Sequence, residues 1–96
     1  MNIQLTDRAA KWFQDEMLLH EGDLVRFHVR YGGLSPIQAG FSLGVHKVEP
    51  IEIASKHVHN GVTYYIEESD VWYFDGHNLE VDYDNQKDEP IYHYNK

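Results

Sequence analysis

The sequence predicts a mainly β fold with one N-terminal helix, an α+β architecture. Apolar residues recur at helical spacing in one early segment and, in most of the later segments, alternate with polar residues as half-buried strands do. The dipeptide Asn60-Gly61 separates two alternating runs, which is the strongest short-range signal for a β-hairpin. We therefore expect one helix packed on a strand-rich body.

The predicted helix spans residues 7–20. Thr6 supplies an N-cap, and Asp7 places a carboxylate near the positive end of the helix. Its apolar face is formed by Ala10, Phe13 and Met17. Glu21-Gly22 should end the helix, because glycine favours the backbone that leaves a helix.

Two strands and a long loop follow. Residues 24–31 alternate apolar and polar side chains, and Gly32-Gly33 ends this strand. Pro36 delays the next strand, which we place at residues 41–46. The two strands should form a hairpin with an unusually long and irregular connection.

The second half contains more strands. Residues 56–67 carry the Asn60-Gly61 hairpin, and Ser69-Asp70 should cap a single helical turn that is closed by Gly76. Residues 79–84 predict a further strand with Leu79, Val81 and Tyr83 inward, and residues 90–96 a short edge strand.

Composition limits the class of protein. A chain of 96 residues predicts a single domain over residues 1–96, and the 42% hydrophobic content is enough for one core. The formal charge of -8 argues against nucleic acid and anionic lipid as partners. Without a signal peptide or an apolar span, we expect a cytoplasmic protein that does not contact membranes. The absence of cysteine excludes disulfides and thiolate ligands.

His57 and His59 are the candidate metal ligands among seven histidines. They lie two residues apart on a predicted strand, so their side chains share a face and can chelate a divalent ion beside a carboxylate. We favour two exposed polar side chains instead, because two ligands alone seldom define a site. No catalytic constellation or phosphate-binding loop is found, so we expect neither an enzyme nor a cofactor.

Four segments together resemble the HesB/YadR/YfhF family, which includes the A-type iron-sulfur carriers. They are IQLTDRAAKWF (3–13), VRYGGLSPIQAGF (29–41), WYFDGHNLEVDY (72–83) and PIYHYN (90–95). The resemblance implies a HesB-like half-barrel or sandwich with mixed sheets, which opens on a short strand before the helix. Within that family the chain is most similar to a small cysteine-free subgroup.

The family's cluster ligands are missing at the matching positions. The first cysteine falls on Leu34, its flanking glycine falls on Pro36, and the chain stops before the tail that supplies the other two cysteines. A leucine has no lone pair to bind iron, so cluster carriage does not transfer with the resemblance. A degenerate cluster site that keeps its loop shape is expected instead.

Three functions stay open. The first is a non-enzymatic accessory, linked to iron-sulfur metabolism, that binds a protein partner or a small molecule. The second is a metal-binding protein, iron included, that uses histidines and carboxylates. The third is a small enzyme, favoured only if a histidine and a carboxylate converge in a closed pocket. A homodimer also stays open.

The candidate binding site follows from the resemblance, which implies that the loop lies near the C-terminal strand. The site comprises Arg30, Tyr31, Gly32, Gly33, Ser35, Gln38, Tyr92, His93 and Tyr94. Aromatic and hydrogen-bonding groups of this kind suit a polar small molecule or a peptide edge. The alternative is a collapsed loop that is sealed by Leu34 and Ile37.

Overall fold

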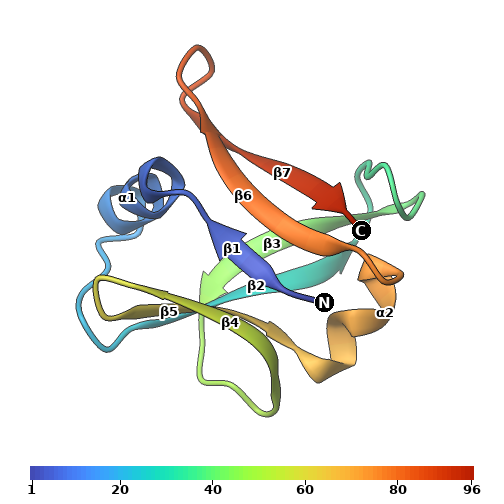
Figure 1. Ribbon diagram of the computed structural model, residues 1–96, viewed down its shortest axis with the longest axis horizontal. Coiled ribbons are helices and arrows are strands. Elements are labelled where there is room, and N and C mark those ends of the chain that lie inside the picture. The colour runs from blue at the N-terminus through green and yellow to red at the C-terminus, as the bar shows by residue number, and fades with distance from the viewer.

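The computed structural model describes residues 1–96 and contains seven strands and three short helical segments (Figure 1). In chain order they are β1 (Ile3–Leu5), α1 (Asp7–Glu16), β2 (Leu24–Tyr31), β3 (Phe41–Lys47), β4 (Ile53–His59), β5 (Val62–Glu67), the 3-10 helix η1 (Glu68–Asp70), α2 (Val71–Phe74), β6 (Asn78–Asp84) and β7 (Glu89–Asn95). The predicted α+β class is confirmed in this form. None of the helices has the length and apolar character that crossing a membrane requires.

The strands form two mixed sheets. The smaller sheet has the order β1-β6-β7, with β1 parallel to β6 and β7 antiparallel to it. The larger sheet has the order β3-β2-β5-β4, in which β2 and β5 are parallel and the outer pairs antiparallel. Both predicted hairpins are present, and Asn60 and Gly61 turn the second one with positive φ angles of 51° and 75°.

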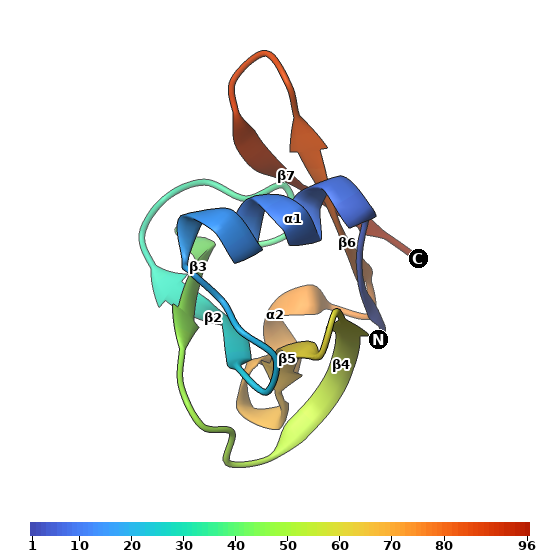
Figure 2. The ribbon, with the colours of Figure 1, turned by 90° about the vertical axis from the view of Figure 1, so that its left-hand side faces the viewer.

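The core lies between the two sheets and α1. The smaller sheet contributes Ile3 and Leu79, and the larger sheet contributes Phe27 and Tyr64. From α1, Phe13 meets Phe27 edge-to-face, with ring centroids 5.5 Å apart. In Figure 2, α1 lies across one side of the molecule, between the β6–β7 hairpin and the larger sheet.

The helix is shorter than predicted. Thr6 is the N-cap, since its side-chain oxygen accepts a hydrogen bond from the Ala9 N–H at 3.2 Å. However, α1 ends at Glu16 rather than at residue 20, and Leu18 has a left-handed backbone with φ of 52°. This turn brings Leu19, only 3% exposed, back into the core, so tertiary packing overrides the helical spacing.

The two sheets meet differently along their two sides. On one side, the Ile3 N–H of β1 donates to the Ser55 hydroxyl of β4 at 3.1 Å. On the other side, β3 and β7 are the end strands of different sheets and do not pair with each other. The two sheets are therefore joined on the side where β1 contacts β4, and they are separate on the side where β3 and β7 lie.

Candidate functional site

A cavity of about 280 Å³ lies between the loop after β2 and the strand β7. Its walls are formed by Leu34, Ser35, Pro36, Ser42, Leu43, Tyr73, Tyr92 and Tyr94. None of these residues is acidic or basic, and the walls combine serine and tyrosine hydroxyls with the apolar surface of leucine, proline and the tyrosine rings. Such a cavity suits an uncharged group that can pack and also hydrogen-bond.

Two glycines shape the loop beside this cavity. Gly32 and Gly33 have φ angles of 103° and 79°, a region that other residues rarely adopt. The Gly32 N–H donates to the Gly40 carbonyl at 2.7 Å, which closes the loop at its base. A Cβ on Gly33 would lie 2.7 Å from the Ser42 hydroxyl oxygen, so that position also has no room for a side chain.

Three tyrosines line the cavity. The Tyr73 and Tyr94 hydroxyls lie 3.0 Å apart and share a hydrogen bond. Burial, with help from Tyr73, raises the pKa of Tyr94 far above its usual value, and a hydrogen bond from Ser35 acts in the opposite direction. Burial also raises the pKa of Tyr92 to about 12. The Tyr92 and Tyr94 phenols are therefore neutral at physiological pH and act as hydrogen-bonding groups.

An exposed row of aromatic rings borders the loop. Tyr31 meets Phe41 edge-to-face with centroids 5.8 Å apart, and Phe41 meets Trp72 in the same manner at 5.2 Å. Tyr31 is 91% exposed, Leu34 94% and Trp72 51%. We call Tyr31, Phe41 and Trp72, together with the aliphatic side chain of Leu34, the aromatic surface. Exposed rings of this kind are typical of the energetic centre of protein interfaces.

The fold brings some of the predicted site residues together. Ser35, Tyr92 and Tyr94 line the same cavity, and Tyr31 lies on the aromatic surface beside it. In the alternative, Leu34 and Ile37 would seal a collapsed loop; Leu34 is almost fully exposed at the cavity's wall, whereas Ile37 packs against the core.

Other predicted residues lie elsewhere. Arg30 and His28 pack over Gly44, where a Cβ would come within 2.9 Å of the Arg30 Cδ atom. His93 is exposed and does not line the cavity, because successive residues of a strand face opposite sides. The Gln38 carbonyl accepts a hydrogen bond from the Phe41 N–H at 3.3 Å, so the main chain of Gln38 helps to close the loop.

Sequence reasoning missed the residues that distant elements bring to this site. Phe41 begins β3, Ser42 follows it, and Trp72 and Tyr73 belong to the short helix α2. Trp72 and Tyr73 are adjacent in the sequence. No local pattern shows that this segment lies against the loop after β2.

The histidine pair lacks a third ligand in a metal-binding arrangement. The His57 and His59 rings are stacked with centroids 6.4 Å apart, and the nearest carboxylate to His59 is that of Asp7 at 3.7 Å. No group of three or more histidine and acidic side chains is arranged to hold a metal ion. Burial and the neighbouring His59 lower the pKa of His57, which favours a neutral side chain.

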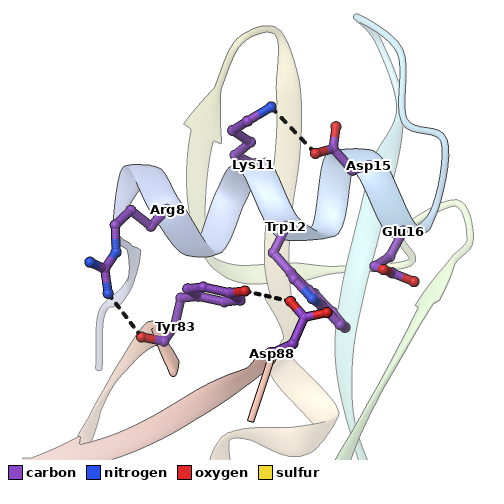
Figure 3. Close-up of a pocket in the computed structure, with 7 residues that line it drawn as sticks. All are labelled: Arg8, Lys11, Trp12, Asp15, Glu16, Tyr83 and Asp88. Carbon is purple, nitrogen blue, oxygen red and sulfur yellow. Dashed lines mark hydrogen bonds and ion pairs between the residues drawn. The ribbon is translucent and has the colours of Figure 1, made fainter. Parts of the chain in front are cut away.

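A separate cavity, of about 320 Å³, lies between α1 and the β6–β7 hairpin (Figure 3). Several of its polar groups are already paired with one another. Lys11 pairs with Asp15 at 3.3 Å, and the Arg8 guanidinium donates to the Tyr83 carbonyl at 3.1 Å. The Tyr83 hydroxyl donates to the Asp88 carboxylate. Glu16 has no such partner.

Comparison with known proteins identifies relatives that match along their whole length. This chain is 49% identical over 94 residues to a Bacillus subtilis protein named Pyruvate dehydrogenase inhibitor, an alignment that covers 98% of this chain and 99% of the relative. The chain belongs to the family of this inhibitor. Uncharacterized proteins of Staphylococcus saprophyticus and Staphylococcus haemolyticus are 42% and 38% identical, with 96% of this chain covered in each case and 97% and 96% of the relatives. No protein-family model matches the sequence.

Membership in the inhibitor family corrects the interpretation of the sequence. The resemblance to the HesB/YadR/YfhF family is wrong, because the full-length relatives point to a pyruvate dehydrogenase inhibitor and not to iron-sulfur proteins. The expected iron-sulfur accessory, the degenerate cluster site and the alternative histidine-carboxylate metal protein are wrong with it. The cavity beside Leu34 therefore needs an explanation that does not start from a lost cluster.

Proposed function

We propose that this protein is a non-catalytic regulator that binds a pyruvate dehydrogenase and lowers its activity. The observation that carries the proposal is the 49% identity, along almost the whole chain, to the Bacillus subtilis protein named Pyruvate dehydrogenase inhibitor. An inhibitor of an enzyme needs a surface for that enzyme and no chemistry of its own. The partner is then a protein, and a cytoplasmic location stays a prediction.

The aromatic surface and the cavity beside it are the proposed contact with the enzyme. Aromatic side chains bury a large area and lose few rotamers on binding, so a small number of them can supply most of the binding energy. Tyr31, Leu34 and Trp72 are the most exposed large side chains around the cavity. The edge-to-face contacts with Phe41 hold two of these rings in place before binding.

The predicted site residues have different roles in this proposal. Gly32 and Gly33 shape the loop, and Ser35, Tyr92 and Tyr94 form the cavity that receives an uncharged group of the enzyme. Arg30, Gln38 and His93 lie beside the contact rather than in it. The small molecule that the sequence also suggested has no support in the comparisons, and neither has the homodimer.

Inhibition of the purified enzyme tests the proposal. Pyruvate dehydrogenase complex from the organism that encodes this chain is assayed by NADH formation while the purified chain is added in increasing amounts. We expect activity to fall to a saturating level, with Tyr31→Ala and Leu34→Ala each weakening inhibition by about tenfold or more. The substrate dependence then shows whether binding excludes pyruvate.

Ile51→Ala is the matched control for Leu34→Ala. Ile51 and Leu34 are both 94% exposed aliphatic side chains, but Ile51 lies in the loop before β4 and outside the aromatic surface. Ile51→Ala should inhibit as well as the parent does. Failure of the unmodified chain to bind or inhibit the complex would overturn the function, whereas equal effects of the two alanine variants would overturn the surface.

A further inference from the structure

The open side of the body presents two unpaired strand edges to the same groove. β3 ends the larger sheet and β7 ends the smaller sheet, and each pairs with a single neighbour. An unpaired edge carries backbone N–H and C=O groups that can pair with a further strand. Which residues carry those groups follows from the hydrogen bonds of the neighbouring strands.

On β3, the free backbone groups belong to Leu43 and Val45. The Gly32 N–H donates to the Gly40 carbonyl and the Val48 N–H to the Leu24 carbonyl, at the two ends of the β2–β3 ladder. Backbone groups of alternate residues point to opposite sides of a strand, so even-numbered residues of β3 face β2. The odd-numbered Leu43 and Val45 consequently face the open side.

On β7, the free groups belong to Tyr92 and Tyr94. The Leu79 N–H donates to the Asn2 carbonyl and the Thr6 N–H to the Val81 carbonyl, so the odd-numbered residues of β6 face β1. The even-numbered residues of β6 then face β7 and pair with its odd-numbered residues. Pro90 also faces the open side, where its missing N–H costs no hydrogen bond.

The same residues line two apolar cavities along the groove. The first is the cavity beside the loop, to which Leu43, Tyr92 and Tyr94 contribute. The second, of about 250 Å³, is lined by Trp12, Phe13, Glu16, Met17, Val45, Pro90 and Tyr92. The two cavities share Tyr92 and follow one another along β3 and β7. An extended segment bound in the groove could therefore place apolar side chains into two successive cavities.

Three carboxylates lie at one end of the groove, where Arg8 and Lys11 line the neighbouring cavity. Glu16 lines the second cavity, and Asp88 and Glu89 lie where the hairpin enters β7. None of the three carboxylates takes part in a salt bridge. Figure 3 shows Glu16 and Asp88 on facing elements, α1 and the β6–β7 hairpin. The loop end of the groove, in contrast, is lined by uncharged side chains.

We propose that the groove binds an extended segment of the partner protein, which adds as a strand to the free edge of β3. Alternate apolar side chains of this segment enter the two cavities, and a lysine or arginine at one end lies near Glu16, Asp88 and Glu89. The backbone edge provides the hydrogen bonds, and the cavities and carboxylates select the sequence. The inference rests on the proposed function, because the dehydrogenase is the partner that supplies the segment.

Amide hydrogen exchange, read by NMR, tests the edge directly. In the isolated chain, the amides of Leu43 and Val45 should exchange roughly tenfold or more faster than those of Gly44 and His46, which face β2. The probes are overlapping twelve-residue peptides that cover the dehydrogenase subunits. A binding peptide should protect Leu43 and Val45 and leave Gly44 and His46 unchanged. Binding without that alternation would overturn strand addition.

The peptide and the carboxylates provide two further tests. Methylation of the peptide's backbone nitrogens at every second position should abolish binding, and methylation at the intervening positions should be tolerated. The double variant Glu16→Gln, Glu89→Gln should bind a lysine- or arginine-containing peptide about two- to fivefold more weakly than the parent does. Glu52→Gln, an exposed carboxylate in the loop before β4, is the control and should have no effect.

The outcomes separate this inference from the function on which it rests. If the chain inhibits the complex but no peptide binds, or methylation has no alternating effect, the strand addition is wrong and the inhibitor function stands. If protection of Leu43 and Val45 increases with protein concentration alone, a second copy occupies the edge and the inference is overturned. If the chain does not inhibit the complex at all, the proposed function fails first.

Discussion

Replacement of Glu67 by glutamine should destabilise the protein substantially. Glu67 is 3% exposed, and its two carboxylate oxygens accept hydrogen bonds from the backbone N–H groups of Ile51 and Glu52, both at 2.7 Å. A hydrogen bond to a charged group contributes about 1.5–3 kcal/mol. Glutamine keeps one acceptor and turns an NH₂ group towards the other N–H, so one bond is lost and a donor is left unpaired.

We therefore expect Glu67→Gln to lower the free energy of unfolding by about 2–3 kcal/mol. In a protein of this size that corresponds to a fall of about 10–20 °C in Tm. Urea unfolding followed by tryptophan fluorescence gives the first quantity, and calorimetry gives the second. The m-value should stay unchanged, because the substitution does not alter the area exposed on unfolding.

Glu68→Gln is the control for this prediction. The Glu68 side chain is exposed and makes no hydrogen bond, and only backbone groups of Glu68 are paired, among them its N–H with the Glu52 carbonyl at 2.9 Å. The Glu68→Gln substitution should lower the free energy of unfolding by less than about 0.5 kcal/mol. Equal effects of the two glutamine variants would refute the reasoning, since net charge rather than the buried carboxylate would then be responsible.

Two further predictions concern tyrosine ionisation and the loop. Burial raises the pKa values of Tyr64 and Tyr92 to about 12, so these tyrosines ionise first in the unfolded state, and the stability present below pH 10 is lost between about pH 10 and 12. The urea midpoint should fall less across that range for the Tyr92→Phe variant than for the parent. Parallel curves for the two proteins would contradict a contribution of Tyr92 to this pH dependence. The Gly33→Ala substitution should lower the free energy of unfolding by at least about 1 kcal/mol more than Gly32→Ala, because only a Cβ at position 33 meets Ser42. Equal falls in Tm for the two variants would contradict this steric difference.

The strands were predictable because local patterns and tertiary burial agree for them. Val25 and Phe27 alternate with polar residues along β2 and are fully buried in the core. The end of α1 was not predictable in this way. The helical spacing continues through Met17, but Leu18 leaves the helix so that Leu19 can enter the core, and only the completed fold makes that exchange favourable.

The mistaken family resemblance also has a physical origin. Gly32 and Gly33 adopt positive φ angles that a tight loop requires whatever the loop does. Short matches of this kind therefore report backbone geometry that unrelated proteins share. The full-length identity to the pyruvate dehydrogenase inhibitor depends on many more positions and is decisive for that reason.

Part of the candidate site could be predicted and part could not. The approach of Ser35 to Tyr92 and Tyr94 was expected, although it was argued from the mistaken resemblance. The row from Tyr31 to Trp72 was not, because its rings come from β2, β3 and α2. Contacts between such distant segments have no periodic signature in the sequence.

The pairing of β1 with β6 has a consequence for how the protein is made. Ile3 and Leu5 lie opposite Leu79 and Val81, so β1 is synthesised well before the strand with which it pairs. Until then both apolar side chains of β1 lack their neighbours, and the core cannot close around them. The inner face of β1 is therefore covered only once β6 has been synthesised and has paired with it.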